Sequence, residues 1–481
     1  MDLWHIIPST QDISLLLERL TALEHLVAQQ QARIVKQDTR IAELEAQLAE
    51  RDARIEEMET QLAKNSSNSS KPPSSDPPNF ERNQSRRKRG KRKPGGQKGH
   101  NGTTLNMVDK PDRTYQYKPA TTCPGCGAST RTAGQSVCSR HQVFDIPLPP
   151  PPVVTEHQIL QCNCPGCGAK LKGELPSEVA SSPTSYGPRI AGFIAYFSVR
   201  HYLPYKRLAE LVADVFGVNV STGTIVNMID RTARSFTPTV QAIKTAIGRA
   251  NVIGSDETFV REGGRKTNIW IWCTRYLTYL ARGPGRGFDV VEREWPEGLA
   301  HATMVSDRLA AQLKINSLKK QICSHHLLRE CYGIADRKET TGWITELIEV
   351  LLRIVRGGAY GRRCYGKTAE FIEADLKELL SEKYYGLLSQ KEANFHASLR
   401  RVREYLTPCL YEREVPPDND ESERDIRGAK VKSKVSGQWR SAKGTEDFCA
   451  IRSVIATAIK QGLRPIEVLL LKKQIALDLF R

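Results

Sequence analysis

The stretch Asn251-Val-Ile-Gly-Ser-Asp-Glu-Thr-Phe-Val260 is apolar and strand-like, with acidic residues in its middle. A second apolar run, Asn268-Ile-Trp-Ile-Trp-Cys-Thr274, follows a Gly-Gly turn, and a third run covers residues 276–280. Runs of β-branched and aromatic residues separated by short turns are typical of consecutive strands. The three runs therefore predict one meander, with Asp256 inside its first strand.

Two further carboxylates stand in comparable places. His301-Ala-Thr-Met-Val-Ser-Asp307 is a short apolar run that places Asp307 at the C-terminal edge of a neighbouring strand. Pro416-Pro417 precede an acidic segment that begins a predicted helix and contains Glu423. Hard oxygen ligands on adjacent strands can share two Mg²⁺ ions, and two ions ~3.5–4 Å apart clamp both reacting oxygens of a phosphodiester. This set predicts phosphoryl transfer on DNA, although a single buried strand Asp is often only structural.

The charge balance predicts the same kind of partner. The 481 residues include 71 Lys and Arg against 54 Asp and Glu, a formal net charge of +17, which favours nucleic acid. No run approaches the ~18 apolar residues of a membrane span. The start, Met1-Asp2-Leu3-Trp4, lacks the basic and apolar regions of a signal peptide. We therefore expect an intracellular protein that binds no membrane.

Residues 12–64 have an apolar residue at every seventh position. One row consists of Ile13, Leu20, Val27, Ile34, Ile41, Leu48, Ile55 and Leu62, and the row three residues later contains Leu16, Leu23, Leu44 and Met58. Such heptads predict a two-stranded coiled coil and hence a homodimer. The alternative is a long amphipathic helix packed on its own domain. Eleven acids against seven bases indicate that the segment joins chains rather than binding DNA.

Residues 65–104 predict a disordered linker that carries a basic arm. Its first part is rich in Ser, Asn and Pro, and residues 82–98 hold nine Lys or Arg and no acid. Such an arm would release counterions when it binds phosphates, which favours DNA binding over a solvated tail. The residues expected to bind DNA are Arg86, Arg87, Lys88, Arg89, Lys91, Arg92 and Lys93.

Residues 105–180 predict a zinc-binding module. Cys123-Pro-Gly-Cys126-Gly and Cys164-Pro-Gly-Cys167-Gly are near copies, and two such knuckles complete a closed four-thiolate site for one structural Zn²⁺. The residues between them, 143–159, predict a hairpin or an extended arm. The spare candidates Cys138, His141 and Cys162 are interpreted as ordinary residues. A redox dithiol is a poor alternative, because the context of these cysteines is not βαβ.

Residues 186–248 predict a helical region with a helix-turn-helix outline. The segment 205–216 is amphipathic, Gly217-Val-Asn-Val220 makes a turn, and Ser221 is a good N-cap for a second helix. That helix presents polar residues of types that contact bases or phosphates. They are Thr222, Thr224, Asn227 and Arg231. An ordinary helical hairpin is the alternative.

From end to end, the chain resembles transposases of the insertion-sequence-66 family. The resemblance rests on the heptads, Asn65-Ser-Ser-Asn-Ser-Ser-Lys-Pro-Pro-Ser-Ser-Asp76, Gly95-Gly-Gln-Lys-Gly-His100, the Cys knuckles, Asp256-Glu-Thr258, Asp307, Cys323-Ser-His-His326 and Asn419-Asp-Glu-Ser-Glu-Arg424. Residues 430–441 are more like the coiled-coil-bearing branch of the family.

The resemblance implies an RNase H-like catalytic domain with a DDE triad of Asp256, Asp307 and Glu423. It implies a role for His326 near the scissile phosphate, with neighbouring His325 as an alternative. Arg424 and Arg427 would contact DNA from the same helix as Glu423. Asp418, Asp420 and Glu421 are alternatives for the third ligand.

The implied activity is metal-dependent cleavage of the element's ends and strand transfer into target DNA, with two Mg²⁺ or Mn²⁺ ions per active site. The implied partners are DNA, as terminal inverted repeats and target, and a second copy of the chain. The implied location is the bacterial or archaeal cytoplasm, on the nucleoid. The alternative is an inactive or co-opted zinc-containing DNA regulator. A structural scaffold would explain only the first 64 residues.

The overall prediction is a multidomain α/β protein whose catalytic domain has a mixed sheet. Residues 249–335 form the first part of the RNase H-like core, and residues 336–414 form an α-helical insertion. Within that insertion, residues 343–356 and 369–406 are helical in pattern. Residues 415–481 supply the helix that contains Glu423 and the C-terminal helices.

Overall fold

The computed structural model describes residues 10–62, 105–176, 179, 182–336, 340–360, 369–471 and 474–477. These residues form fifteen α-helices, two 3₁₀ turns and seven β-strands, so the predicted α/β class with a mixed sheet is confirmed. Two compact units are present, Met1–Gln84 with Arg329–Glu339, and Ser85–Leu328 with Thr340–Arg481. None of the helices in the described part of the chain is both long and apolar enough to cross a membrane.

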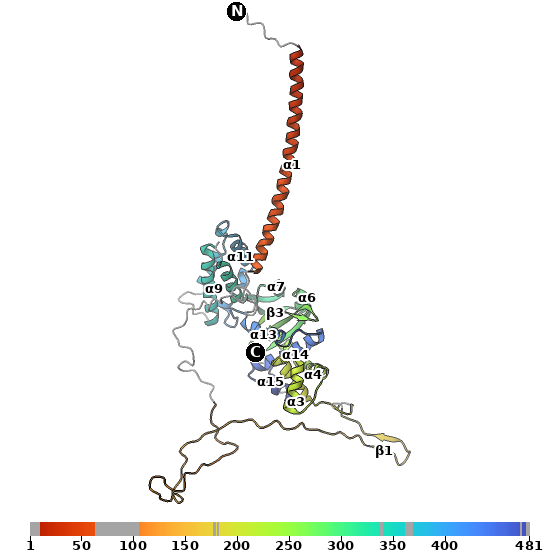
Figure 1. The fold of residues 1–481 in the computed structure, drawn as a ribbon, viewed down its shortest axis with the longest axis vertical. Coiled ribbons are helices and arrows are strands. Elements are labelled where there is room, and N and C mark those ends of the chain that lie inside the picture. Colours follow the sequence, from red (N-terminus) through yellow and green to blue (C-terminus); the bar gives the residue numbers. More distant parts are fainter. Residues whose placement is uncertain are drawn as a thin grey trace, which may run out of the picture. The chain divides into compact units, whose positions relative to one another are not determined.

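In the first unit, α1 (Thr10–Leu62) is one unbroken helix of 53 residues (Figure 1). Its sequence contains no Gly or Pro, and its heptad positions form a stripe that drifts around an ideal helix by about 20° per heptad. Apolar side chains of the heptad rows are exposed, and Ile34 and Ile41 are both 53% exposed. The predicted helix is confirmed, whereas its pairing with a second copy stays a prediction.

The zinc-module segment contains two short antiparallel strands, β1 (Gln161–Asn163) and β2 (Lys170–Lys172), which flank the second knuckle. Residues 143–160 form neither strand nor helix. The hairpin, one of the two predicted alternatives for this stretch, is therefore not observed.

Four helices follow, α2 (Pro188–Arg200), α3 (Tyr205–Phe216), α4 (Thr222–Ser235) and α5 (Thr237–Ile247). Gly217 closes α3 with φ +65°, a conformation that glycine adopts without strain. The Ser221 hydroxyl then accepts a 3.0 Å hydrogen bond from the Thr224 N–H at the start of α4. Two helices and a glycine turn are therefore present where they were expected, whereas their identity as a DNA-binding helix-turn-helix stays a prediction.

The sheet has the strand order β5-β4-β3-β6-β7. The strands β3 (Val252–Glu262), β4 (Arg265–Cys273) and β5 (Thr278–Gly283) form the predicted meander with antiparallel pairing. After α6 (Phe288–Glu294), the strand β6 (Leu299–Ser306) pairs parallel to β3. After α7 (Ala310–Leu313), the strand β7 (Ser317–Ile322) pairs parallel to β6. Asp307 follows β6 directly, at the predicted edge.

Helices cover both faces of this sheet, and β4 shows why its sequence is almost entirely apolar. Ile269 and Ile271 pack in one buried cluster with residues of α2, α4 and α14 (Ala442–Lys460). Trp270 and Trp272 point to the opposite face, where they pack with residues of α5 and α6. A central strand buried on both sides has no polar face, so the run Ile-Trp-Ile-Trp does not alternate with polar residues.

The remaining helices come after β7 in the sequence, and one of them, α13, contains the acidic segment. They are α8 (Ser324–Ala335), α9 (Gly342–Tyr360), α10 (Ala369–Leu379), α11 (Gln390–Arg400), α12 (Pro408–Tyr411), α13 (Asp420–Val435) and α15 (Pro465–Leu471). Residues 369–406 were expected to be helical throughout, but the turns η2 (Glu382–Tyr384) and η3 (Arg403–Tyr405) interrupt them. Gly386, with φ +78°, lies in the break.

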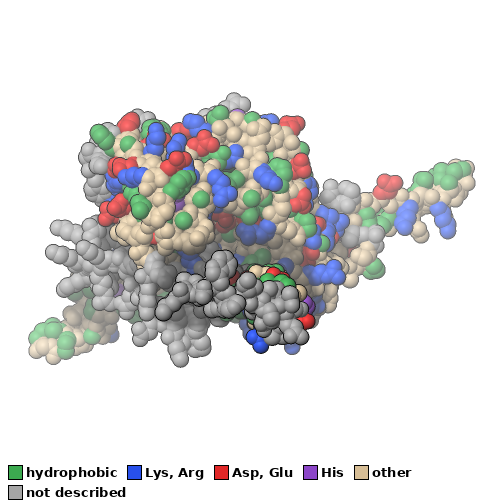
Figure 2. Space-filling model, turned by 90° about the horizontal axis from the view of Figure 1, so that it is seen from above, with side chains coloured by type: hydrophobic (Ala, Val, Ile, Leu, Met, Phe, Trp, Pro, Cys, Tyr) green, Lys and Arg blue, Asp and Glu red, His purple; other side chains and the backbone are tan. Residues whose placement is uncertain are grey.

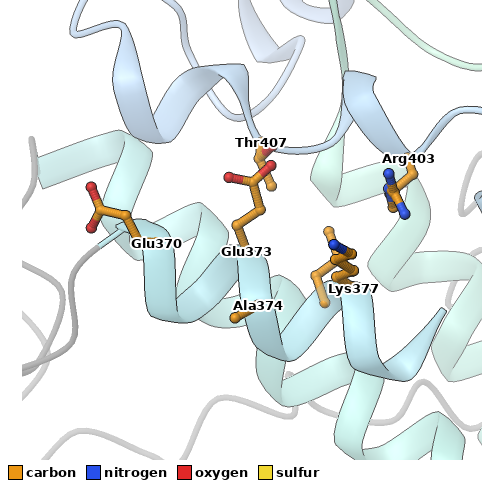
Figure 3. A pocket seen from close by; sticks show the side chains of 7 residues that line it. Glu370, Glu373, Ala374, Lys377, Arg403 and Thr407 are labelled. Carbon is orange, nitrogen blue, oxygen red and sulfur yellow. The ribbon is translucent and has the colours of Figure 1, made fainter. Parts of the chain in front are cut away.

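A pocket of about 320 Å³ opens in this helical part (Figure 3). Glu370, Glu373 and Lys377 of α10 line it together with Arg403 and Thr407. Acids and bases are balanced in this pocket, and it contains none of the predicted site residues. Figure 2 likewise shows a face on which Lys and Arg are interspersed with Asp and Glu rather than gathered in one block.

Candidate active site

Asp256, inside β3, and Asp307, directly after the carboxyl end of β6, lie together on two neighbouring parallel strands. The register of β3 with β6 pairs Gly254 with Val305, so that two residues further along Asp256 stands beside Asp307. Ligand atoms of Asp256, Glu257 and Asp307 lie within 4.8 Å of one another. Burial raises the pKa of Asp256 well above its usual value, and the charges of Glu257 and Asp307 raise it further. The site therefore concentrates negative charge that a cation would neutralise.

Glu257 is a member of this cluster that sequence reasoning missed. Neighbouring residues of a strand point to opposite faces, so the strand pattern alone does not group Glu257 with Asp256. Arg286 Nε donates a 2.9 Å hydrogen bond to Glu257 Oε1, and Gln312 Nε2 donates one of 2.9 Å to Oε2. Because both carboxylate oxygens already accept hydrogen bonds, Glu257 is less suited to ligate a metal than its two neighbours.

The helix that contains Glu423 is docked tightly on β3. A Cβ atom at Gly254 would lie 2.6 Å from Ser422 Oγ and 3.2 Å from Asn419 Oδ1, so only glycine permits this approach. Asn419 Nδ2 donates a 2.7 Å hydrogen bond to the carbonyl oxygen of Ser255. Both Ser422 and Asn419 are buried. These contacts fix the start of α13, and with it Glu423, beside the strand of Asp256.

Glu423 itself belongs to a second group. It shares a metal-sized cluster with Cys323 and His326, whereas the cluster of Asp256 and Asp307 does not include it among the described residues. His326 Nδ1 lies 3.4 Å from Glu423 Oε1. The charge of Glu423 nevertheless contributes to the raised pKa of Asp256, after burial and the nearer acids. The structure thus brings the two Asp residues together and holds Glu423 nearby, without uniting all three.

The two adjacent histidines have different partners. His325 Nδ1 lies 3.2 Å from Asp420 Oδ1, and these two residues group with Asp418. His326, in contrast, faces Glu423. Burial raises the pKa of the Cys323 thiol to about 12, so this cysteine stays a neutral thiol and accepts a hydrogen bond from the Asn419 N–H at 3.2 Å. Cys323 therefore helps to hold the Glu423 helix rather than acting as a thiolate.

The residues present fit divalent cations. Glu423 Oε1 is buried and accepts no hydrogen bond from the described residues. Asp256 and Asp307 bring two more carboxylates to the same part of the sheet, where burial and the charges of Glu257 and Asp307 disfavour the charged state of Asp256. Carboxylate oxygens in this number are ligands that Mg²⁺ and Mn²⁺ prefer.

The two Cys knuckles are structural copies. In each, the first Cys accepts at its carbonyl a 2.9 Å hydrogen bond from a glycine, Gly127 or Gly168, and both glycines have φ +73°. Backbone N–H groups of the turn lower the pKa of the Cys123 and Cys164 thiols, which favours the thiolate that zinc binds.

Each knuckle thus offers a pair of thiols suited to zinc. In residues 105–176, however, Cys123, Cys126, Cys164 and Cys167 do not gather into one cluster. The four-thiolate site stays a prediction. The spare candidates Cys138, His141 and Cys162 are exposed and join no metal-sized group in this segment.

The predicted DNA-binding residues fall into three sets. On α4, Thr222, Asn227 and Arg231 are exposed, while the Thr224 hydroxyl lies 2.9 Å from that of Ser221 and belongs to the helix cap. Arg424 and Arg427 are exposed on α13, and Arg427 Nη2 lies 3.9 Å from Glu423 Oε2. The basic arm from Arg86 to Lys93 lies outside the described residues.

Comparison with known families agrees with this geometry. The model of the family described as "Transposase IS66 family" matches residues 183–447, which is more than half of the chain. Residues 120–168, with both Cys knuckles, match the "zinc-finger binding domain of transposase IS66". Residues 8–106 match a family of unknown function, DUF6444. No curated protein matches the chain. The chain therefore belongs to the IS66 family of transposases, carries that family's zinc-finger domain and, as a transposase, binds DNA.

Proposed function

We propose that this transposase cuts the ends of its own element and joins them to target DNA at a site formed by Asp256, Asp307 and Glu423. In the first step water breaks the phosphodiester at the element's end and leaves a 3′-OH. In the second step that hydroxyl attacks a target phosphodiester, so that one P–O bond forms and the target's P–O3′ bond breaks. The observation that supports this proposal is the pair of carboxylates that the parallel strands β3 and β6 bring together, Asp256 within β3 and Asp307 directly after β6.

Asp256 would hold two divalent cations, and Asp307 and Glu423 would each hold one of them. When bound, such ions lower the pKa of water and stabilise the charge on the reacting phosphate. His326 faces Glu423 Oε1 at 3.4 Å and would keep this carboxylate turned towards the site. Arg424 and Arg427 would bind the phosphates next to the scissile bond. The strand order β5-β4-β3-β6-β7 supports an RNase H-like fold, with residues 336–414 as its helical insertion.

The other parts of the chain would hold the DNA and the second copy. The basic arm at residues 86–93 would bind phosphates, and α4 would present Thr222, Asn227 and Arg231 to a DNA groove. The zinc finger would fold around one Zn²⁺ held by its four knuckle cysteines. The exposed heptad rows of α1 would pair two chains, so that two active sites act on two element ends.

An assay of the purified full-length protein tests this function. With Mg²⁺ or Mn²⁺ it should nick and join DNA that contains an element end. Asp256→Asn should abolish both reactions and leave DNA binding intact. Glu257→Gln is the matched control and should lose far less activity, because Glu257 is already bound by Arg286 and Gln312.

Two outcomes would contradict the proposal. Normal cleavage by the Asp256→Asn variant would show that the assigned site is wrong. Specific binding to element ends without cleavage in any divalent metal would identify the protein as a DNA-binding regulator.

A further inference from the structure

The run of residues after the catalytic-site helix contains no acid over a long stretch. Between Asp425 and Glu446 the chain has six basic residues and no carboxylate. They are Arg427, Lys430, Lys432, Lys434, Arg440 and Lys443. This stretch includes residues 430–441, which have no role in the proposed cleavage and strand-transfer reactions.

The same stretch is joined to the turn between β3 and β4. The Trp439 N–H donates a 3.0 Å hydrogen bond to the carbonyl of Arg261, and the Gly263 N–H donates one of 2.8 Å to the carbonyl of Trp439. The Gly264 N–H donates a 3.0 Å hydrogen bond to the side chain of Gln438. Trp439 is buried and its ring lies edge-on to Phe448. The loop between α13 and α14, residues 436–441, is therefore part of the folded domain and is hydrogen-bonded to the hairpin formed by β3 and β4.

The hairpin adds three exposed cations, Arg261, Arg265 and Lys266. The acid next to the hairpin's turn, Glu262, is turned inward, where Arg282 donates hydrogen bonds of 2.8 and 2.6 Å to it. Apart from Arg427 near Glu423 and Lys443 in α14, five exposed cations of the two segments define what we call the hairpin–loop surface. It consists of Arg261, Arg265, Lys266, Lys434 and Arg440.

An exposed aromatic ring lies on β3 between this surface and the carboxylates. Phe259 is 56% exposed although it belongs to a central strand. Lys430 Nζ lies 4.0 Å from the centre of its ring, so a cation accompanies the aromatic face. Phe259 is three residues, or about 10 Å, along the strand from Asp256. Alternation directs the two side chains to opposite faces, and both residues lie beyond Gly254, where the pairing of β3 with β6 ends.

A cationic track beside an exposed aromatic ring is the usual arrangement for binding single-stranded nucleic acid. Phosphates bind the cations, while the ring stacks on a base, and within a duplex both faces of a base are covered by its neighbours, so an unpaired base is the better partner for the ring. An acidic protein surface would satisfy the cations but would offer the exposed ring of Phe259 no base to stack on. The combination therefore favours DNA whose strand is unpaired where it approaches the carboxylates.

We propose that the hairpin–loop surface binds an unpaired DNA strand next to the active site and that one base of this strand stacks on Phe259. This inference rests on the proposed function. The strand would run over Arg265 and Lys266, pass Phe259 and Lys430, and reach Asp256. This assigns to the site a specific form of its substrate, a DNA end with unpaired nucleotides.

Binding measurements on the full-length protein without added Mg²⁺ or Mn²⁺ test the stacking. The probes are a fluorescent blunt duplex and the same duplex with a short oligothymidine extension. Phe259→Ala should bind the extended probe roughly 5- to 100-fold more weakly than wild type and bind the blunt probe unchanged. Phe259→Trp should retain the preference. Phe371→Ala, which removes a ring of similar exposure (59%) on α10, is the control and should bind both probes as wild type does.

Two results would overturn this assignment. One is a Phe259→Ala variant that binds the extended probe as wild type does. The other is an equal loss on both probes while Phe259→Trp also fails, because that pattern would mark the ring as a packing residue. The measurement involves no cleavage, so it stands whether or not the protein cuts DNA at Asp256.

The cations have a separate readout. Affinity for DNA falls as salt rises, and the double variant Arg265→Glu, Lys266→Glu should make the slope of log affinity against log salt less steep by about 1.4 to 1.8. Arg249→Glu changes an exposed arginine that precedes the opposite end of β3, and it serves as the control. Equal slopes for the double variant and wild type would exclude the hairpin–loop surface as the DNA-binding track.

Discussion

Asn419 Nδ2 donates a 2.7 Å hydrogen bond to the carbonyl oxygen of Ser255, the residue before Asp256. Asn419 occupies the N-cap of α13, yet its side chain caps none of that helix's N–H groups. An N-cap Asn normally contributes about 1 kcal/mol by capping. Here the side chain instead ties the helix of Glu423 to the strand of Asp256, and this tie sets the separation of the two carboxylates.

Replacing Asn419 should therefore affect catalysis more than folding. Asn419→Ala leaves the buried Ser255 carbonyl without its donor, which should lower the free energy of unfolding by about 1–3 kcal/mol. A misplacement of Glu423 by about 1 Å should reduce cleavage about 100-fold, with DNA affinity unchanged. Ser389→Ala, which removes the capping box of α11, is the control.

The control variant should lose stability but keep its cleavage rate at saturating metal. Equal loss of cleavage in both variants would reduce the role of Asn419 to general stability. Measurement of cleavage against Mg²⁺ concentration makes the distinction, because only the Asn419 variant should need more metal.

Gly254 should be intolerant of any side chain. In Gly254→Ala the new Cβ would lie 2.6 Å from Ser422 Oγ, so α13 must move, at a cost of about 1–3 kcal/mol in unfolding free energy. Adding Ser422→Ala removes the clashing oxygen and should restore part of the loss. Gly342→Ala, where a Cβ meets nothing within 4 Å, should be neutral in the same denaturant titration. A fully stable Gly254→Ala protein would show that α13 does not dock as described.

Much of this fold can be predicted from the sequence, and the features that cannot be predicted share one physical reason, which is that they depend on contacts between distant parts of the chain. The meander, the strand that ends at Asp307 and the capped helix after Gly217 follow from local patterns, because strand period and cap chemistry act over a few residues. The grouping of Glu257 with Asp256 does not follow from a local pattern. It depends on Arg286 and Gln312, which belong to other parts of the chain and hydrogen-bond the Glu257 carboxylate. The role of Asn419 cannot be predicted from the sequence either. An Asn at the N-cap position is expected to cap its own helix, and only the packing of α13 on β3 gives it the Ser255 carbonyl as a partner.

Divalent metal should stabilise the protein through the carboxylates alone. Because burial and the neighbouring acids raise the pKa of Asp256, Mg²⁺ or Ca²⁺ should bind the folded state and raise Tm. At a metal concentration of 100 times Kd the gain is about 2.7 kcal/mol. Asp256→Asn should be at least as stable as wild type without metal and should gain less from it. An equal metal-dependent rise in Tm for both proteins would place the binding site elsewhere.

Zinc content should depend equally on both knuckles. Cys123→Ser and Cys164→Ser should each reduce bound zinc from one ion per chain to nearly none, because a structural site requires all four thiolates. Cys138→Ser changes an exposed cysteine outside the knuckles and should keep the metal. Metal analysis of the purified variants gives the answer. Full zinc in either knuckle variant would show that the two knuckles do not share one ion.

Self-association should depend on the heptad rows of α1 and not on its apolar content. Ile34→Asp with Ile41→Asp places charges at two positions of one row, each 53% exposed in the single chain, and should convert a dimer to monomers. Val35→Asp is the control, since Val35 is 65% exposed and lies next to the row rather than in it. Sedimentation equilibrium of the full-length proteins distinguishes them. A dimer that survives in the double variant, or one that is lost in Val35→Asp, would rule out the heptad seam as the contact between the chains.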